Sequence, residues 1–419
     1  MRSRGEGVVM AERFSATKRG LLRQFIHWLD SKARSREELI ALCLERIAAR
    51  DAQLKAWVEV SPQPELNRGP LTGIPFGAKD IFETLNLATE YGSPLYAGRK
   101  GSSDAALVAH LRELGAVLLG KTQTTAFAYL DAAPTHNPHD PSRTPGGSSS
   151  GSAVAVAAGM VPFALGTQTL GSIIRPASFC GVVGFKPTYG SLPLGGVLPF
   201  APSLDTAGLF TQTADDMRLL WTRIGNKNAI PKPWLGVPTV MPPVEPQMEI
   251  AFRTTVERLS LSYQVNVVEL PQDFPQMTGT ARLIAAYEGA RTHAPRHREY
   301  GERIGRKLAQ LVEEGLRITV SEYHAALALI ADVKRETRRL FHEYPFLLTP
   351  AAPGPAPEGL ESTGDPVMNC AWTALGFPVI SVPMSAHNGL PMGLQIVADL
   401  GCDSELVTLA VHIESTLND

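Results

Sequence analysis

The sequence lacks the features that would place it in several large classes of protein. It has only four cysteines in 419 residues, and no two of them have the C-x-x-C spacing of zinc or redox sites. These cysteines are Cys43, Cys180, Cys370 and Cys402. The most apolar stretch, residues 153–165, is interrupted by Gly159 and Pro162 and is shorter than the roughly 20 residues that cross a bilayer. The charges nearly cancel, with 39 Lys and Arg against 41 Asp and Glu, so there is no electrostatic reason to bind nucleic acid or an anionic membrane.

These absences lead to a definite set of expectations. The cysteines are expected to be buried free thiols in a reducing compartment. Residues 1–20 are basic and polar without an apolar segment, so they do not resemble a secretory signal. His136 and His139 lie three residues apart, but Pro138 and Pro141 prevent the helix that would align them on a metal. We expect a soluble, cytoplasmic protein that requires no metal or cofactor and binds neither nucleic acid nor a membrane.

The order of apolar and polar segments indicates the fold class. Ser35 followed by Glu38 predicts a capping box at the start of a helix, with Leu39, Cys43 and Ile47 as its buried stripe. Later, short apolar runs alternate with helix-like segments and Gly/Pro turns, which favours an α/β fold with a mostly internal sheet. These runs are residues 74–81, 116–119, 161–166, 182–185, 346–349, 379–382 and 394–397.

Residues 213–345 have a different character, because they are mainly helical in pattern and rich in charge. Helices are expected at 299–311 and 323–341, with one isolated strand at 265–268, and a final helix near 404–417 closes the chain. Without an internal repeat or a low-complexity linker, the chain is expected to form a single domain over residues 1–419. Its parts would be an N-terminal extension (1–34), a core that carries the motifs below (70–220), a helical elaboration (225–345) and a return to the sheet (346–419).

The most informative segment contains glycine and serine in close succession. Residues 145–152 read Pro-Gly-Gly-Ser-Ser-Ser-Gly-Ser, and residues 170–175 read Leu-Gly-Ser-Ile-Ile-Arg. Glycine permits backbone conformations that other residues resist, and small residues let backbone N–H groups approach a ligand. A flexible linker would not be flanked on both sides by apolar runs that need burial. The pattern therefore indicates a structured site.

Two familiar motifs occur here without the context that each requires. Residues 147–151 fit the G-x-S-x-G nucleophile elbow with Ser149 as nucleophile, but three prolines in residues 137–145 prevent the preceding strand. Residues 115–122 fit the phosphate-loop pattern G-x-x-x-x-G-K-T, but the interval Ala-Val-Leu-Leu is itself a strand. Lys121 is therefore expected to end a buried strand and to bind no nucleotide.

A serine nucleophile needs a base within hydrogen-bond reach and an oxyanion hole. No histidine occurs between His139 and His293, which weakens a Ser–His arrangement. Lysine can replace histidine when burial lowers its pKa. Lys79 lies inside the apolar segment 74–82, an unusual place for a lysine. Taken alone, this position fits a catalytic base and a lysine paired with Asp80 equally well.

Together these motifs resemble the amidase signature family. Residues 71–80, Leu-Thr-Gly-Ile-Pro-Phe-Gly-Ala-Lys-Asp, resemble the family's catalytic-lysine strand, and residues 145–159 resemble its Gly/Ser signature. Ser148 and Ser172 have the family's spacing (172 − 148 = 24). The likeness continues in residues 179–188, 203–208 and 389–397. It covers most of the chain from about residue 35 and is weakest in 225–345.

The resemblance implies a fold and a mechanism. The fold would be a central mixed twisted sheet covered by helices on both sides. Ser172 would be the nucleophile, Ser148 would follow a cis peptide bond and relay the proton, and Lys79 would be the neutral base. The backbone N–H groups of Thr169, Leu170, Gly171 and Ser172 would form the oxyanion hole. The chain would then hydrolyse an amide through an acyl-enzyme, without metal or cofactor.

The chain departs from the family pattern at one position of this hole. Leu170 stands where a glycine is common. If the backbone there needs a positive φ, leucine costs about 1–2 kcal/mol or shifts the amide. Leu170 is therefore expected to narrow the substrate range or to impair the site.

Within the family the likeness is greatest to the malonamidase type, on residues 124–128, 137–139, 146–152, 166–169 and 362–366. In that type an arginine three residues beyond the nucleophile grips the substrate carboxylate, and Arg175 holds the matching position. A guanidinium binds a carboxylate bidentately, although it can equally serve a salt bridge or backbone carbonyls. The expected substrate is a small carboxylate-bearing amide such as malonamate.

Other functions stay open on the same residues. The chain could be the glutaminase subunit of a tRNA-dependent amidotransferase, which would depend on partner subunits. It could hydrolyse allophanate or a similar urea derivative. It could also be a non-catalytic binding protein if Leu170 spoils the oxyanion hole. A homodimer is plausible from the family likeness only.

Overall fold

The computed structural model describes residues 20–229, 234–384 and 389–418 of the chain. Its strands are β1 (Trp57–Val60), β2 (Pro75–Lys79), β3 (Val117–Thr122), β4 (Phe163–Gln168), β5 (Val183–Lys186), β6 (Thr206–Thr211), β7 (Trp234–Pro238), β8 (Gln264–Val268), β9 (Phe346–Pro350), β10 (Val379–Pro383) and β11 (Gly393–Ala398). Within the described residues these eleven strands form one sheet in the order β1-β3-β2-β4-β6-β5-β10-β11-β9-β7-β8.

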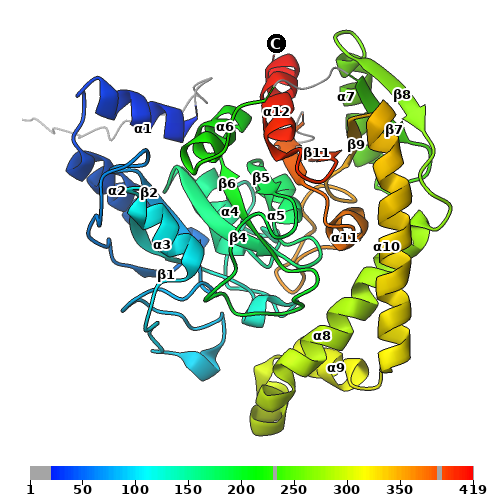
Figure 1. Cartoon of the computed structure of the whole chain (residues 1–419). Helices are drawn as coiled ribbons and strands as arrows, with labels where there is room; N and C mark the ends of the chain where they lie inside the picture. The colour runs from blue at the N-terminus through cyan, green and yellow to red at the C-terminus, as the bar shows by residue number, and fades with distance from the viewer. Residues whose placement is uncertain (1–19, 230–233, 385–388, 419) are drawn as a thin grey trace, which may run out of the picture.

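Helices surround this sheet (Figure 1). They are α1 (Leu21–Asp30), α2 (Arg36–Leu54), α3 (Ala106–Glu113), α4 (Ser150–Ala157), α5 (Ile174–Cys180), α6 (Ala214–Arg223), α7 (Pro246–Leu259), α8 (Met277–Tyr300), α9 (Arg306–Gly315), α10 (Val320–Glu343), α11 (Val367–Ala374) and α12 (Asp403–Asn418). Helix α2 begins with the predicted capping box, since Ser35 and Glu38 exchange side-chain-to-backbone hydrogen bonds. Its predicted stripe of Leu39, Cys43 and Ile47 is buried.

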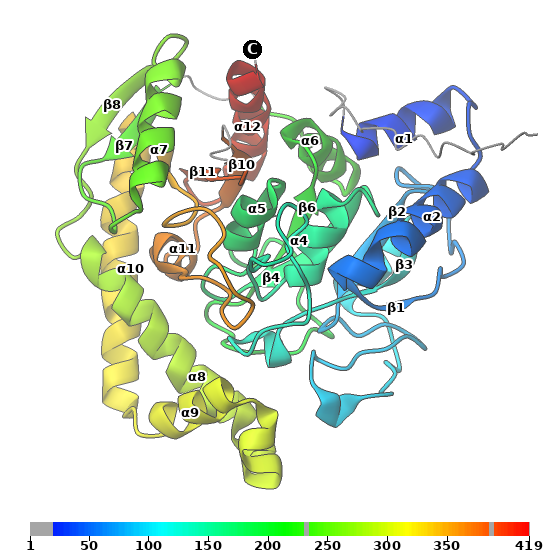
Figure 2. The ribbon, with the colours of Figure 1, turned by 180° about the vertical axis from the view of Figure 1, so that it is seen from behind.

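The sheet is mixed, as the family resemblance implies. Strands β3, β2 and β4 run parallel, those from β4 through β6, β5, β10 and β11 to β9 are antiparallel neighbours, and β9, β7 and β8 are parallel again. The central strands are buried along their whole length, as the continuous apolar runs required. Helices α4 and α5 cover one side of these strands, as the view from behind shows, whereas α6 and α12 pack on the other (Figure 2). The predicted α/β fold with helices on both sides is confirmed.

The strand predicted at 265–268 is present as β8, but it is not isolated. It pairs in parallel with β7, and β7 pairs with β9, so both strands extend the main sheet. Strand β7 was missed because its sequence, Trp-Leu-Gly-Val-Pro, contains glycine and proline, which are poor strand formers. Strand β6 was missed for a similar reason, since Thr-Ala-Gly-Leu-Phe-Thr has no clear alternation. The segment 225–345 therefore contributes to the sheet as well as to the surrounding helices.

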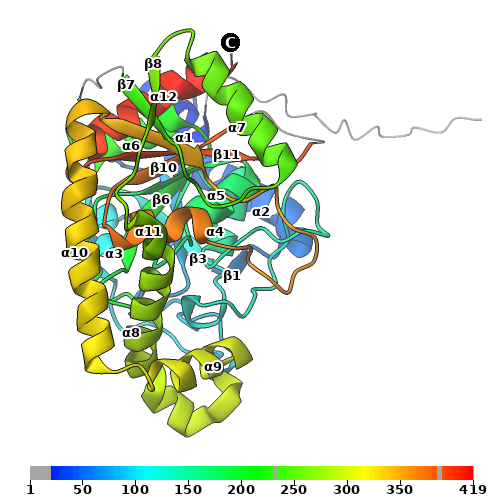
Figure 3. The same cartoon turned by 90° about the vertical axis from the view of Figure 1, so that its right-hand side faces the viewer.

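Helices α8, α9 and α10 form an arm beside the sheet (Figure 3). The helix predicted over 299–311 is in fact divided, because α8 ends at Tyr300 and α9 begins at Arg306. Between them Gly301 has φ 57° and Gly305 has φ 110°, conformations that interrupt a right-handed helix. The second predicted helix lies within α10, which opens with a capping box at Thr319.

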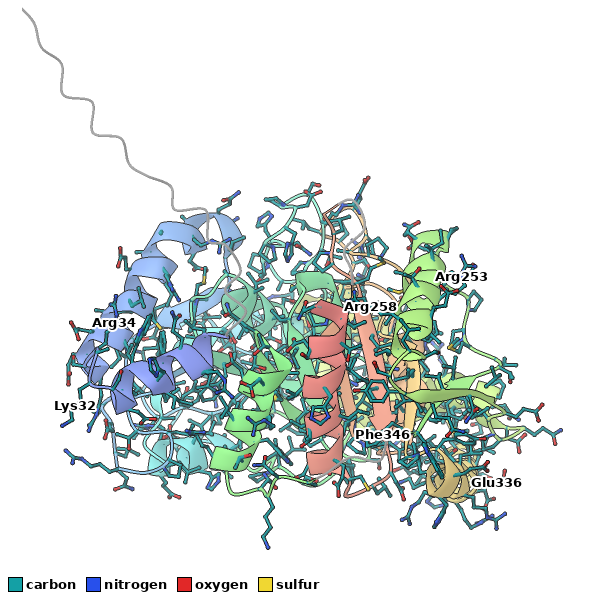
Figure 4. The ribbon with its side chains drawn as sticks, turned by 90° about the horizontal axis from the view of Figure 1, so that it is seen from above. Lys32, Arg34, Arg253, Arg258, Glu336 and Phe346 are labelled. Carbon is teal, nitrogen blue, oxygen red and sulfur yellow. The ribbon has the colours of Figure 1, made fainter. Side chains whose placement is uncertain are left out.

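Helix α7 lies near the C-terminal end of the chain. Arg258 of α7 donates a hydrogen bond to the carbonyl of Leu417, in the last turn of α12, at 3.1 Å (Figure 4). Among the helices that the structure describes, none combines the length and the apolar character that crossing a bilayer requires.

Candidate active site

Strand β2 brings Lys79 into the interior of the molecule. The side chain is fully buried, and its Nζ donates hydrogen bonds to Ser148 Oγ at 2.7 Å and to Thr167 Oγ1 at 2.8 Å. Both acceptors are neutral hydroxyls, so neither contact neutralises an ammonium charge. Burial lowers the pKa of Lys79 to about 7, and the carboxylate of Asp205 opposes this shift. Near neutral pH a substantial fraction of Lys79 is therefore the free amine that a proton acceptor must be.

Asp205 is the buried carboxylate of this region. It accepts hydrogen bonds from the hydroxyl of Thr169 and from the backbone N–H groups of Phe200 and Ala201. Burial raises its pKa to about 6, and these three hydrogen bonds oppose the rise. Asp205 thus holds the residue that begins the predicted oxyanion segment and also acts electrostatically on Lys79. The sequence marks Asp205 only as part of a family motif and indicates no role for it or for Thr167.

Ser148 stands at the start of a tightly folded turn before α4. The Gly147–Ser148 peptide bond is cis, as the family resemblance implies. The neighbouring Ser149 is fully buried, and its hydroxyl donates to the carbonyl of Thr167 at 3.2 Å. Ser149 therefore serves the packing of the turn on β4, and Ser148 is the serine that meets Lys79.

Ser172 lies in the connection between β4 and α5, with 9% of its surface exposed. Among the described residues, none accepts a hydrogen bond from the backbone N–H groups of residues 169–172. The next two amides, of Ile173 and Ile174, both donate to Gln168 Oε1, at 2.8 and 3.0 Å. Gln168 thus fixes the first turn of α5 and leaves the four preceding amides available. Such a run of unpaired donors suits a developing oxyanion.

Leu170 causes no strain in this loop. The φ angle of Leu170 is not positive, so the free-energy cost of a leucine in a left-handed conformation does not arise. Its carbonyl accepts a hydrogen bond from Thr373 Oγ1 at 2.8 Å, and the same hydroxyl accepts one from Gln168 Nε2 at 2.9 Å. These hydrogen bonds anchor the loop to α11. The side chain of Leu170 is partly buried and packs against the hydrophobic core.

Gly171 is the position where a side chain could not be accommodated. An added Cβ would lie 2.5 Å from Asn369 Oδ1 and 2.9 Å from both Arg175 Nη1 and the Cβ of Pro366. Glycine is required here because α5 and α11 approach the backbone of the loop this closely. The glycine before Ser172 is therefore required by packing.

Arg175 is buried behind the same loop, with 2% of its surface exposed. Its Nε donates to the carbonyl of Thr363 at 2.6 Å, and its Nη2 donates to the carbonyl of Gly147 at 2.6 Å and to Thr363 Oγ1 at 3.1 Å. Nη1 has no partner among the described residues. Burial lowers the pKa of Arg175 to about 10. The guanidinium thus ties the residue before Ser148 to the 351–366 segment.

The remaining residues that the sequence singled out lie elsewhere. His136 and His139 contact the carbonyls of Pro141 and Cys180. Lys121 lies at the last position but one of β3, close to the predicted strand end, and donates to backbone carbonyls. Three of the four cysteines are buried and unpaired, but Cys402 is only half-buried, contrary to expectation, because it stands in the exposed turn before α12.

A cavity of about 150 Å³ adjoins this arrangement. Its polar lining consists of Thr167, Thr169 and Asp205, and its other walls are apolar. Thr167 contacts Lys79 directly, and Thr169 begins the run of free amides. The structure therefore brings together a buried amine, the hydroxyl of Ser148, a loop whose backbone amides at residues 169–172 have no acceptor among the described residues, and a cavity lined by Thr167 and Thr169.

Comparisons with known proteins show which proteins this chain resembles in sequence and in fold. A glutamyl-tRNA(Gln) amidotransferase subunit of Exiguobacterium sp. is 30% identical to this chain over 451 residues, which cover 90% of the chain and 93% of that protein. A solved amidase superposes with a TM-score of 0.85 at 29% identity, over 94% of this chain and 99% of its own. The glutamyl-tRNA(Gln) amidotransferase subunit from Thermotoga maritima superposes with a TM-score of 0.77 at 29% identity, over 89% of this chain and 90% of its own.

A sequence model of a protein family shows which family this chain belongs to. The family model named Amidase matches residues 33–407, which include Lys79, Ser148 and Ser172. The resemblance predicted from the motifs is confirmed at the level of the family, while the relatives above do not single out the malonamidase type. The fold, the sequence relatives and the solved structures agree, and the chain belongs to the Amidase family.

Proposed function

We propose that the chain hydrolyses a small primary amide to an acid and ammonia through an acyl-enzyme on Ser172, with Lys79 as base and Ser148 as relay. The observation that carries this proposal is the environment of Lys79. The amine is fully buried, has a pKa lowered to about 7, and lies 2.7 Å from the hydroxyl of Ser148. Because both hydrogen-bond partners of this amine are neutral hydroxyls, the contacts stabilise its charged form less than burial destabilises that form, and the free amine can accept a proton from Ser148.

The proposed reaction has two halves. Neutral Lys79 takes the proton of Ser148, Ser148 takes the proton of Ser172, and Ser172 Oγ bonds to the carbonyl carbon of the amide. The carbonyl oxygen becomes an oxyanion that the free N–H groups of residues 169–172 stabilise, typically by a few kcal/mol. The proton returns through Ser148 to the nitrogen as the C–N bond breaks, which releases ammonia. Water then attacks the acyl-Ser172 ester by the same proton path and releases the acid.

The geometry gives little support to malonamate as the substrate. That prediction depends on a bidentate contact between Arg175 and a carboxylate. Two of the three nitrogens of Arg175 already donate to protein oxygens, and only Nη1 has no partner among the described residues. A bidentate contact would require one of those hydrogen bonds to be released. We therefore infer that Arg175 chiefly positions the Gly147–Ser148 segment.

A second candidate is the glutaminase reaction of a glutamyl-tRNA(Gln) amidotransferase. It is supported by the names of relatives such as the Exiguobacterium protein, which match this chain over nearly its whole length. In this case the substrate is L-glutamine, and full activity requires further subunits.

Ammonia release decides between these candidates. The purified chain and its Ser172→Ala variant would be tested on propionamide, malonamate, allophanate and L-glutamine. We expect turnover of at least one amide by the chain alone and none by the variant, with folding checked by circular dichroism. Activity that survives in Ser172→Ala would contradict the proposed nucleophile. Activity on L-glutamine alone, raised by the other subunits of an amidotransferase, would favour the second candidate.

A further inference from the structure

The size and the lining of the cavity beside Thr167 and Thr169 limit which substrate groups it could bind. Its apolar lining includes Ile81, Leu194, Val197, Leu198, Phe200 and Pro202. The volume is about 150 Å³, and an apolar cavity of about this size in another protein binds a benzene molecule. When the leaving group is ammonia, the acyl part is all of the substrate that remains to be bound. The size of the cavity therefore bears on the acyl group.

Among the described residues that line the cavity, only Asp205 is charged, and its carboxylate already accepts hydrogen bonds from the protein. Its two carboxylate oxygens accept three hydrogen bonds, from Thr169, Phe200 and Ala201. It therefore offers little to a substrate cation, while its negative charge disfavours a substrate carboxylate in the same low-dielectric space. A neutral apolar group meets neither a repulsive charge nor an unpaired polar partner there.

The helical arm holds one wall of this cavity in place. Glu288 of α8 accepts a hydrogen bond from the backbone N–H of Ser203 at 2.9 Å and another from the hydroxyl of Tyr323 of α10 at 2.6 Å. Gly289 of α8 lies so close to the ring of Phe200 that an added Cβ would be 3.0 Å from it. The wall formed by residues 199–205 is thus fixed from outside by the arm, which sets the depth of the cavity.

We propose that this cavity, here called the acyl cavity, receives the neutral, apolar acyl chain of a primary amide, with room for about four to six carbon atoms. The proposal rests on the amide hydrolysis proposed above and names the substrate class of that site. Saturated and branched aliphatic amides of this length, and benzamide, are the compounds that fit. Malonamate, allophanate and L-glutamine each bring an ionised carboxylate and are disfavoured.

The test is a series of unbranched primary amides from propionamide to heptanamide, with malonamate and L-glutamine as charged members. Each buried methylene raises kcat/KM by about fourfold, so pentanamide should exceed propionamide by about tenfold or more. The rise should stop once the cavity is full. A profile that stays flat from propionamide to pentanamide, or a charged amide that is turned over faster than every neutral one, overturns the acyl cavity.

Two variants localise the effect. Val197→Phe places bulk inside the acyl cavity and should bring the ratio of pentanamide to propionamide turnover close to one. Val240→Phe is the matched control, because it makes the same change in a second apolar cavity, lined by Phe274 and Trp372, and should leave the ratio as in the wild type. Equal ratios in the two variants would overturn the proposal. If Val197→Phe does not fold, Leu198→Ala replaces it and should move the optimum to a longer chain.

The failure of this inference can be told from a failure of the proposed function. Amide turnover that does not depend on Ser172 contradicts the proposed function, whatever its chain-length profile. Turnover that depends on Ser172 but ignores the acyl chain overturns only the acyl cavity. The same acyl series as p-nitrophenyl esters reports acylation of Ser172 directly and gives the profile where amide turnover is slow.

Discussion

Two lysines at the ends of neighbouring parallel strands show how the same residue type is used in two ways. Lys79 ends β2 and Lys121 lies near the end of β3, and both are fully buried. The strands pair with Lys79 opposite Thr122 and Ala78 opposite Lys121. Since side chains alternate along a strand, this offset of one residue sends the two lysines to opposite faces of the sheet.

The two faces give the amines very different partners. Lys121 donates to the carbonyls of Phe82 and Ala88, and lies 3.5 Å from the carboxylate of Asp80. Lys79 has two neutral hydroxyls. Burial lowers both pKa values, to about 8 for Lys121, where Asp80 opposes the shift, and to about 7 for Lys79. We therefore infer that Lys121, which has a buried carboxylate beside it, is a structural cation, and we propose Lys79 as the base.

The largest expected effect is the loss of activity when Lys79 is changed. Lys79→Met should lower kcat/KM for the preferred amide by at least about a thousandfold, because the base is removed. Its melting temperature should rise, since a buried amine without a charged partner is replaced by an apolar side chain of similar length. Ammonia release and calorimetry measure the two effects. Activity within tenfold of the wild type would place the base elsewhere.

Lys121→Met should have the opposite profile. It leaves the carboxylate of Asp80 buried without its cation, which typically costs about 3–5 kcal/mol of stability. The folded fraction should keep most of its activity per labelled Ser172, because Lys121 does not contact the proposed triad. Urea denaturation measures the first effect and active-site titration the second. A stable but inactive Lys121→Met protein would reverse the roles of the two lysines.

Asp205→Asn is expected to have a moderate effect. The charge of Asp205 raises the pKa of Lys79, so its removal should let that pKa fall and move the acid limb of the pH–rate profile to lower pH. Asparagine also has one acceptor oxygen in place of two, so it cannot accept both from the hydroxyl of Thr169 and from the two amides of Phe200 and Ala201, and kcat should drop by about tenfold. An acid limb that moves to higher pH, or does not move, would contradict the proposed electrostatic link.

The smallest effect is expected at Leu170, the residue that the sequence suggested would narrow the substrate range or impair the predicted oxyanion hole. Leu170→Gly should change kcat/KM by less than about threefold, because Leu170 needs no positive φ and its carbonyl keeps the hydrogen bond from Thr373. Steady-state kinetics on one amide is sufficient. A gain of tenfold or more would show that the leucine side chain obstructs the hole after all.

Much of the fold could be predicted from the sequence, because buried strands leave continuous apolar runs. The run at 74–81 contains an observed strand, and the runs at 161–166 and 379–382 each overlap one. Strand β6 was missed although it lies at the centre of the sheet. This strand is buried because β4 and β5 flank it, and its own sequence has no pattern that predicts a strand. The break between α8 and α9 depended on two glycines whose φ values only the folded chain reveals.

The candidate site was predictable where a motif marks it and not where tertiary contacts create it. Lys79, Ser148 and Ser172 were singled out from the sequence, and the structure brings Lys79 and Ser148 into contact. The sequence could not decide whether Lys79 is a base or forms an ion pair with Asp80. The answer depends on the register of β2 with β3, which places Asp80 next to Lys121. The engagement of Arg175 by backbone carbonyls left no signal in the sequence.

The most direct test of this account is the pH dependence of the rate at which a fluorophosphonate probe labels Ser172. Labelling of the wild type should rise through an apparent pKa of about 7, as Lys79 loses its proton. Lys121→Met should show the same limb, and Lys79→Met should be labelled very slowly at every pH. A labelling rate that is constant from about pH 6 to 9, or a limb that persists in Lys79→Met, would contradict the assignment of Lys79 as the base.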